Sequence, residues 1–269
     1  MKLMDGKRVA SAWTKRLQGK FKRVGKLVAI LVGDNPASLV YLEKKALMAK
    51  ELGVRFELCQ FKASVNQSIV EKKIALLNND RQVAGIIVQL PLPTNWNTAR
   101  VINAIIPSKD VDGLTDTNIS NGQVLPATAV GILKLLEEYK IKLQGKNIVL
   151  VGFTRLLNIP LSIYLASLKN NVTVLQEGTR NKSVLCEADM IITATGKPKL
   201  ITGKNVKQGV VIIDAGVSRV NKKLVGDADF ASVSKKARLI TPVPGGVGPM
   251  TVVALFANLY QAVGSRSGR

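Results

Sequence analysis

The chain has 269 residues, of which 46% are hydrophobic, and its formal net charge is +21 at pH 7. This length and apolar content leave room for two globular domains. Histidine is absent, which excludes a histidine general base, a Ser-His-Asp triad and a zinc site built on imidazole. Proton transfer must therefore use lysine, tyrosine or carboxylate groups, and we expect no metal cofactor.

The first part of the chain alternates predicted strands and helices. Its apolar runs are typical of parallel strands that are covered on both faces. Pro36 and Gly53 mark the start and the end of the first crossover helix. The pattern predicts a mainly parallel sheet with right-handed crossovers. The predicted strands are 26–33, 54–61 and 84–90, and the predicted helices are 37–52, 67–78 and 97–106.

A second α/β unit follows a polar connection that ends at Asn121-Gly122. We therefore place a domain change near residue 123, and the fold class is α/β with two domains. The predicted elements of the second unit are a helix at 129–139, strands at 146–152, 172–176, 190–194, 210–215 and 238–241, and a last helix at 251–264.

The helix after Gly33 carries Tyr41 and Lys45, which are four residues apart and share one face. Ligands of open α/β sheets gather at the carboxyl ends of strands, where this helix begins. A lysine placed there can carry protons as a general acid and base. The alternative is an ordinary amphipathic helix with solvated lysines, which the spacing alone favours.

Two further polar residues follow predicted elements of the first domain. Gln89 ends a buried strand before a sharp Leu90-Pro91 turn, so its amide faces the carboxyl edge of the sheet. Asp112 lies in the turn 109–113, where its carboxylate can accept hydrogen bonds from amino and ring N–H groups of a ligand. The alternative for Asp112 is a turn former.

The strand that ends at Gly152 and the following helix predict a dinucleotide-phosphate site. The glycine pattern G-x-G-x-x-G is not present, since only Gly152 remains of it. Glu177 stands where an acid would hold the ribose of NAD and would repel the extra phosphate of NADP. Arg180 and Lys182 could offset that repulsion.

The segment 241–251 contains three prolines and three glycines. Such a loop is rigid and poor in side chains, so a flat ligand can approach it closely. Pro249 suits the first turn of the last helix. The alternative is a plain strand-to-helix turn.

Cys59 and Cys186 are the only cysteines and have no partner spacing, which favours free thiols in a reducing cytoplasm. No unbroken apolar run reaches the length of a membrane span, and no secretory signal is present, so we expect a cytoplasmic protein without a membrane partner. The positive charge attracts anions. However, it is spread along the chain and only 4% of residues are aromatic, so we expect no nucleic-acid partner.

Taken together, these segments resemble the methylenetetrahydrofolate dehydrogenase/methenyltetrahydrofolate cyclohydrolase family, nearly from end to end. The matching pieces are 3–7, 32–38 with Tyr41 and Lys45, 89–93, 109–114, 194–198, 213–216 and 241–251.

The resemblance implies a catalytic domain at 1–122, a Rossmann-like domain for NADP or NAD at 123–250, and a folate cleft between them. The helix 251–269 would pack back on the first domain. The implied enzyme oxidises methylene-tetrahydrofolate to methenyl-tetrahydrofolate with NAD(P), and hydrolyses the product to formyl-tetrahydrofolate. It would be a homodimer that acts on tetrahydrofolate derivatives, whose polyglutamate tails the basic surface would attract.

The resemblance also implies roles for single residues. Lys45 would be the central proton carrier, assisted by Gln89, while Tyr41 stacks on the folate and Asp112 holds the pterin ring; these four form the catalytic group. The remaining implied folate-binding residues are Val88, Leu90, Pro242, Pro244, Gly245, Gly246, Val247, Gly248, Pro249 and Met250. The implied cofactor-binding residues are Gly152, Phe153, Thr154, Glu177, Thr195, Gly196, Gly216 and Val217.

The chain departs from the family pattern in the cofactor domain. Phe153 replaces an arginine, Thr154 a serine and Asn158 a glycine, and Gln176-Glu177 stands where the family has His-Ser. One alternative is therefore a cyclohydrolase whose dehydrogenase activity is weak, lost or shifted to NAD. An alternative of another class is a non-catalytic protein that binds folate or nucleic acid.

Overall fold

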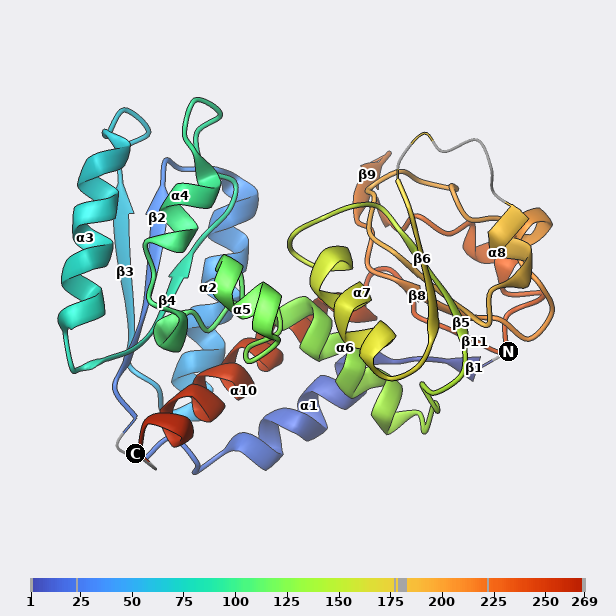
Figure 1. Cartoon of the computed structure of the whole chain (residues 1–269), viewed down its shortest axis with the longest axis horizontal. Coiled ribbons are helices and arrows are strands. Elements are labelled where there is room, and N and C mark those ends of the chain that lie inside the picture. The colour runs from blue at the N-terminus through green and yellow to red at the C-terminus, as the bar shows by residue number, and fades with distance from the viewer. Residues whose placement is uncertain (1, 23, 177, 179–182, 222, 268–269) are drawn as a thin grey trace. The chain divides into compact units, whose positions relative to one another are not determined.

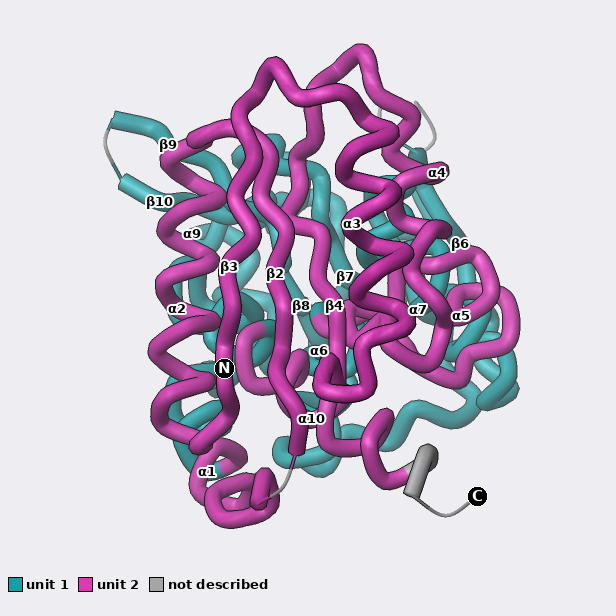
Figure 2. The backbone as a smooth tube through the Cα atoms, turned by 90° about the vertical axis from the view of Figure 1, so that its left-hand side faces the viewer, with its two compact units in different colours: residues 1–12, 128–251 teal, residues 13–127, 252–269 magenta. Residues whose placement is uncertain are grey.

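The computed structural model describes residues 2–22, 24–176, 178, 183–221 and 223–267. The chain forms two compact units, which Figure 2 shows in different colours: residues 1–12 and 128–251 make unit 1, and residues 13–127 and 252–269 make unit 2. The chain passes from one unit to the other within three helices, α1 (Gly6–Leu17), α6 (Ala127–Glu138) and α10 (Val247–Ser267). The first twelve residues thus group with residues 128–251.

Unit 2 contains a parallel sheet of three strands in the order β3-β2-β4 (Figure 1). The central strand β2 (Lys26–Val32) pairs with β3 (Phe56–Phe61) on one side and with β4 (Val83–Val88) on the other. The first strand of the unit therefore has its two successors on opposite sides. This arrangement is a topological switch point, and ligands of open α/β sheets bind at the carboxyl ends of such strands.

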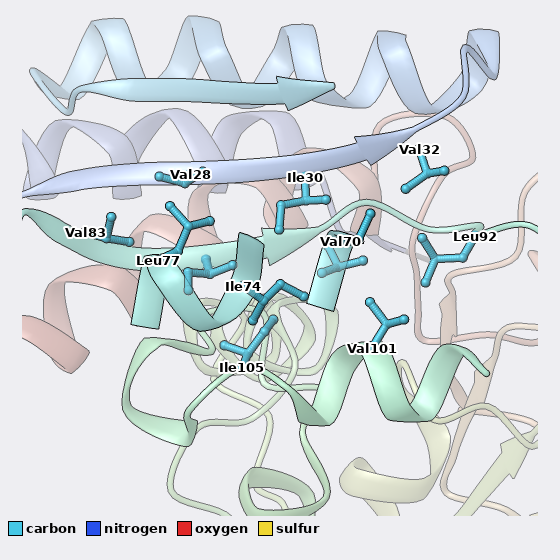
Figure 3. Packing of buried hydrophobic residues seen from close by; sticks show 12 residues of the cluster. Val28, Ile30, Val32, Val70, Ile74, Leu77, Val83, Leu92, Val101 and Ile105 are labelled. Carbon is cyan, nitrogen blue, oxygen red and sulfur yellow. The ribbon is translucent and has the colours of Figure 1, made fainter. Parts of the chain in front are cut away.

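The helices of unit 2 cover this sheet. Helix α2 (Pro36–Leu52) begins where the Asn35 side chain accepts hydrogen bonds from the Ala37 and Ser38 N–H groups, and it ends at Gly53 with φ +72°. Figure 3 shows Ile74 of α3 (Gln67–Asn79) and Val101 of α4 (Thr98–Asn103) on the same side of the sheet as Val28 and Ile30 of β2. These side chains form one buried core.

Unit 1 contains a parallel sheet of six strands in the order β1-β11-β8-β7-β5-β6. Here β5 has its successors β6 and β7 on opposite sides, so its carboxyl end is a second switch point. The strands are β1 (Lys2–Leu3), β5 (Asn147–Val151), β6 (Asn171–Leu175), β7 (Met190–Thr193), β8 (Val211–Asp214) and β11 (Leu239–Ile240). The predicted α/β class with two parallel sheets is confirmed.

Several short elements were not predicted from the sequence. Helix α1 begins where the Asp5 carboxylate accepts the Arg8 N–H at 3.0 Å. Helix α5 (Asp116–Asn121) is capped by Thr115 and ends at Gly122. Local capping therefore marks the ends of α5, a segment of six residues that is too short to show an apolar period. The others are α8 (Ser183–Glu187), α9 (Phe230–Val233), the 3-10 turns at Pro107–Lys109 and Gly203–Asn205, and an antiparallel pair, β9 (Ser218–Val220) and β10 (Lys223–Val225). The helix predicted after Gly152 is α7 (Asn158–Ser167).

Helix α10 begins at Val247, four residues earlier than predicted, and Pro249 lies in its first turn. Among the described residues it is the one helix long and apolar enough to cross a membrane, over Val247–Gly264 with a mean hydropathy of 1.3. Half of that segment is buried, and within unit 2 the Phe256 ring meets the Phe21 ring edge-on at 6.4 Å. These are the features of a core helix in a folded domain.

Candidate active site

Lys45, Gln89 and Asp112 lie together at the switch point of the unit 2 sheet. The Lys45 amine donates a hydrogen bond of 3.2 Å to Gln89 Oε1, and it lies 3.9 Å from Asp112 Oδ2. Lys45 is only 9% exposed, although it is a lysine on a helix near the start of a domain. The three residues come from α2, from the end of β4 and from the turn before α5, and the sequence named each of them separately.

The Gln89 side chain is held in one orientation. Its backbone N–H donates to the Ile30 carbonyl at 2.9 Å, which extends the pairing of β4 with β2 by one residue. Its side-chain Nε2 donates to the Leu90 carbonyl at 2.9 Å, so Oε1 is left to face the Lys45 amine. The Ser38 hydroxyl of α2 donates to the same Leu90 carbonyl at 3.2 Å. The helix that carries Lys45 and the strand end that carries Gln89 are therefore tied together.

The other residues of the 109–113 turn position Asp112. The buried Lys109 amine donates to the carbonyls of Leu77, Asn78 and Asp80 at 2.7–2.8 Å, which fixes the turn to the end of α3. The Asp110 carboxylate accepts the N–H groups of Gly113 and Thr115, at 2.9 and 2.8 Å, and the Asn118 amide at 2.9 Å. With these groups satisfied, Asp112 is the carboxylate of the turn that faces Lys45.

Helix α10 also holds this turn, through a residue that the sequence did not single out. Asn258 Nδ2 donates to the Val111 carbonyl at 3.0 Å and to the Leu125 carbonyl at 2.9 Å. Asn258 is 4% exposed, so these bonds are made away from water. No local sequence pattern indicates this contact, because Asn258 lies 147 residues from Val111 in the sequence.

Burial raises the pKa of the Asp112 carboxyl, the Lys45 ammonium opposes that effect, and Asp110 adds to it. A carboxyl group that is removed from water next to one cation is suited to bind a polar, hydrogen-bonding ligand group. The site therefore offers an amine, an amide oxygen and a carboxyl within one small volume.

Tyr41 lies one helical turn before Lys45, and the residue is 41% exposed. The Lys44 amine stands over this ring, 5.4 Å from its centre. An exposed aromatic ring of this kind can stack on a flat ligand. Of the two residues that flank Gln89, Val88 is 4% exposed and belongs to the core, while Leu90 is partly exposed.

The loop predicted to bind folate, Pro242–Met250, is fastened within unit 1. Its Gly245 carbonyl accepts the Gly6 and Lys7 N–H groups at 3.0 and 3.2 Å, and the Gly246 N–H donates to the Pro242 carbonyl at 2.8 Å. A Cβ at Gly6 would lie 1.7 Å from the Gly246 carbonyl oxygen, so only glycine fits there.

Not every residue of this loop is available to a ligand. Pro244 and Gly248 are exposed, and Pro242, Gly245 and Pro249 are partly exposed. In contrast, Gly246 is buried, and Val247 and Met250 are 5% and 0% exposed and belong to the hydrophobic core.

The predicted dinucleotide turn follows β5, at the switch point of unit 1. Gly152 has φ +105°, and a Cβ there would lie 3.0 Å from the Ala194 carbonyl oxygen. The turn 153–157 then leads into the N-terminus of α7, where the Ile159 N–H donates to the Thr154 carbonyl and Pro160 has no N–H. The order of strand, glycine turn and helix is the one found at dinucleotide sites. Phe153 is 58% exposed, and Glu177, Arg180 and Lys182 lie outside the described residues.

Asn158 occupies the start of α7 where the family pattern has glycine. It is fully buried, and its Nδ2 donates to the carbonyls of Val151 and Gly152, at 3.0 and 2.7 Å. The Asn158 side chain is therefore fixed to the end of β5 by hydrogen bonds and does not project into the turn. The Thr154 carbonyl accepts the Ile159 N–H at 3.1 Å, which closes the turn.

The other predicted cofactor residues lie in the loops after β7 and β8. Thr195 and Gly196 follow β7, and Gly216 and Val217 follow β8. The backbone N–H groups of Thr195 and Gly216 donate to two buried carboxylates, Asp227 at 2.7 Å and Asp214 at 3.0 Å. Burial raises the pKa of Asp214 to about 6. The sequence did not single out either carboxylate.

Within the part of the chain that the structure describes, no group of three or more His, Cys, Asp or Glu side chains is arranged to hold a metal ion.

Two family models match the chain. The catalytic domain of tetrahydrofolate dehydrogenase/cyclohydrolase matches residues 4–112, and the NAD(P)-binding domain of the same family matches residues 126–267. Both matched ranges contain the features described above, with Lys45, Gln89 and Asp112 in the first and the Gly152 turn in the second.

Whole proteins agree with these matches. The chain is 42% identical over 276 residues to the bifunctional protein FolD of Sulfurihydrogenibium sp. (strain YO3AOP1), which covers 97% of each chain. The structure of this chain is similar to that of the bifunctional FolD enzyme from Campylobacter jejuni, with a TM-score of 0.96, 37% identity and 99% of each chain covered. It is also similar to the FolD of Trypanosoma brucei, solved with NADP and an inhibitor, with a TM-score of 0.92, 31% identity and 100% and 98% of the two chains covered.

Proposed function

Because the chain belongs to the tetrahydrofolate dehydrogenase/cyclohydrolase family, we propose that it is a bifunctional enzyme of folate one-carbon metabolism. It oxidises methylene-tetrahydrofolate to methenyl-tetrahydrofolate with NADP, and it hydrolyses the methenyl product to formyl-tetrahydrofolate. The observation that carries this proposal is the group formed by Lys45, Gln89 and Asp112.

The hydrolytic half requires a group that moves protons, because water must lose one proton as it adds to the methenyl carbon. The hydroxyl of the adduct then releases its remaining proton to solvent as it becomes the formyl carbonyl. The carbon–nitrogen bond that breaks needs a proton on its nitrogen, so two transfers need a protein group: from the attacking water and to this nitrogen. We assign both transfers to the Lys45 amine, since the protein has no histidine. Gln89 accepts a hydrogen bond from that amine at 3.2 Å, and so aims it at one position.

The remaining residues of the site bind and orient the substrate. Asp112 accepts hydrogen bonds from the amino and ring N–H groups of the pterin. The exposed Tyr41 ring stacks on the folate. Holding the pterin in this way brings its one-carbon bridge to the lysine.

The oxidative half uses a bound nicotinamide dinucleotide, which supplies the hydride acceptor. Gly152 and the N-terminus of α7 hold its phosphates, with Phe153 and Thr154 in the same turn, and the loops with Thr195, Gly196, Gly216 and Val217 lie beside them. NADP is the cofactor of the similar Trypanosoma brucei enzyme.

The family assignment also indicates which part of the chain binds which ligand. We propose that the N-terminal domain with the C-terminal helix binds folate and that residues 123–250 bind the cofactor. We also propose a cytoplasmic homodimer whose substrates include folates with polyglutamate tails. The +21 net charge supports the last point, because a tail of glutamates is a polyanion.

The test is steady-state oxidation of methylene-tetrahydrofolate with NADP and with NAD, with the methenyl product measured by absorbance after acid quench, and separate hydrolysis of methenyl-tetrahydrofolate. Both activities are expected. Hydrolysis without oxidation by either cofactor would instead support a cyclohydrolase with a decayed nucleotide site, which the substitutions Phe153 and Asn158 suggest. Neither activity would contradict the proposal and favour a binding protein.

Cofactor preference has its own test at Glu177. Glu177→Ser removes a negative charge from the position where the sequence predicts the ribose, so the KM for NADP should fall while the KM for NAD rises. Unchanged KM values for both cofactors would contradict this electrostatic explanation.

A further inference from the structure

Two buried aspartates lie at the carboxyl edge of the unit 1 sheet, and no role has been assigned to either of them above. Asp214 is the last residue of β8 and is 3% exposed, and Asp227 follows the β9–β10 hairpin and is fully buried. Among the residues that the structure describes, neither has a lysine or arginine as its hydrogen-bond partner. Their partners are backbone N–H groups and one threonine hydroxyl.

Asp227 is bound to the strand and the loop next to it. Its Oδ2 accepts the Thr193 hydroxyl and the Thr195 N–H, both at 2.7 Å. Thr193 ends β7, and Thr195 is two residues into the loop that follows. One carboxylate oxygen therefore fixes the direction in which the chain leaves β7.

The other oxygen of Asp227 packs against Gly216. It is buried and has no hydrogen-bond partner within the described part of the chain, and a Cβ at Gly216 would lie 2.0 Å from it. A buried carboxylate oxygen without a partner is unfavourable for stability, and such groups are uncommon in folded proteins. Departures of this kind are expected where the geometry of a site is needed.

Asp214 completes the arrangement from the opposite direction. Its carboxylate accepts the N–H groups of Gly216, Asp227 and Ala228, at 3.0, 3.1 and 2.8 Å. A Cβ at Gly226 would lie 2.1 Å from Asp214 Oδ2. Asp214 thus holds the segment that carries Asp227, while Asp227 holds the loop after β7. Both ends of the β9–β10 hairpin are fastened in this way.

These contacts lie next to the dinucleotide turn. The Ala194 carbonyl and the Thr195 N–H belong to the same peptide group. The oxygen of that carbonyl is 3.0 Å from the position of a Cβ at Gly152. The Ser218 hydroxyl, at the start of β9, donates to the Gly196 carbonyl. The loop after β7 therefore lies between the Gly152 turn and the hairpin, and Asp227 determines its path.

We propose that Asp227, supported by Asp214, is a positioning residue for the dinucleotide, which fixes the loop after β7 against the cofactor. This rests on the dehydrogenase activity proposed above. Asp227 touches neither cofactor nor substrate in this role; it acts through the Thr195 N–H. Its loss should therefore weaken NADP binding and leave the folate hydrolysis at Lys45 unchanged.

The experiment compares four variants of the full-length protein with the wild type. Asp227→Ala removes both hydrogen bonds, and Asp227→Asn keeps one acceptor oxygen. Thr193→Val removes only the hydroxyl donor, so it is the variant to use if Asp227→Ala does not fold. Asp189→Ala is the matched control, because Asp189 adjoins β7 at its amino end, where it accepts the Asn147 N–H and binds Lys207.

Three quantities are measured: the KM and kcat of NADP-dependent oxidation, the Kd of NADP by fluorescence titration, and amide hydrogen exchange of residues 194–197 without cofactor. Asp227→Ala should raise the KM and the Kd by about tenfold or more, and Thr193→Val by about threefold. Both should speed exchange at 194–197. Asp227→Asn should stay within about threefold of the wild type, and Asp189→Ala should not change either constant.

The outcomes separate this inference from the proposed function. Wild-type KM and Kd in Asp227→Ala or Thr193→Val would overturn the inference. Oxidation and hydrolysis that fall together, in proportion to a loss of folded protein, would also overturn it, since that is the mark of a merely structural residue. If the wild type neither binds NADP nor oxidises the folate, the proposed dehydrogenase is wrong, and the exchange data still show whether Asp227 orders the loop.

Discussion

Lys45 and Gln89 are 44 residues apart in the sequence, and a hydrogen bond of 3.2 Å joins the amine of the first to Oε1 of the second. The bond is specific, because Gln89 Nε2 is occupied by the Leu90 carbonyl and Oε1 is left for the amine. Asp112 adds a carboxylate 3.9 Å from the same amine. A lysine with one neutral and one ionisable acceptor can release a proton and recover it.

Gln89→Glu tests whether the neutral acceptor matters. A second carboxylate beside Lys45 would hold the amine in its charged form, so hydrolysis of methenyl-tetrahydrofolate should slow by about 10-fold to 100-fold. The measurement is the kcat of hydrolysis, with the exposed Gln208→Glu as a control that adds the same charge elsewhere. A wild-type kcat in Gln89→Glu would count against the role given to this pair.

Asn258→Leu tests how α10 holds the Asp112 turn. The change leaves the carbonyls of Val111 and Leu125 buried without their amide donor, which should lower the free energy of unfolding by about 2–4 kcal/mol. It should also raise the KM for folate, because Asp112 loses its support. Urea unfolding and steady-state kinetics give both values. Asn95→Leu, at an exposed position, should change neither, and an equal effect of the two substitutions would refute the explanation.

Gly6→Ala tests the support of the Pro242–Met250 loop. The added methyl group would overlap the Gly246 carbonyl oxygen, at 1.7 Å, so the loop must move. We expect a loss of about 2 kcal/mol or more in stability. Gly264→Ala meets no atom within 4 Å on helix α10 and should stabilise the protein by about 0.5–1 kcal/mol. Similar effects of both changes would contradict the steric argument.

Asp214 predicts a pH dependence of stability. Its pKa is raised from 3.8 to about 6, so between these values the folded protein holds a proton that the unfolded chain has lost. Stability from this group is therefore lost as the pH rises towards 6, and the difference is equivalent to about 3 kcal/mol. Asp214→Asn does not titrate. The wild type should thus gain stability relative to Asp214→Asn between pH 7 and pH 4.5, in urea unfolding at both values. A constant difference would show that Asp214 titrates normally.

Much of the fold and part of the site could be predicted from the sequence. The continuous apolar runs of β2, β4 and β5 identify buried parallel strands, and the caps of α2 are local signals at Asn35, Pro36 and Gly53. The polar residues that follow such strands, such as Gln89, are the natural candidates for a site. What local pattern cannot show is a contact between distant segments.

The residues that the sequence analysis missed make contacts between distant segments of the chain. Asn258 acts on a carbonyl 147 residues away, and Asp227 acts on Thr193 and Thr195 from beyond a hairpin that the sequence did not predict. The motif at 3–7 was matched by resemblance, but its reason is the contact of Gly6 with Gly246, which requires the folded chain. Val247 and Met250 belong to a motif that the resemblance places at the folate, but they are buried in the core, so their contact with a ligand stays a prediction.

The most direct test of the account is the rate of methenyl-tetrahydrofolate hydrolysis by Lys45→Met, with Lys44→Met as the matched control on the adjacent, solvent-facing position. The account predicts that Lys45→Met loses hydrolysis by about 100-fold or more, while Lys44→Met stays within about threefold of the wild type. Circular dichroism should show both variants folded. Hydrolysis by Lys45→Met at the wild-type rate would show that another group carries the proton and would contradict the central claim.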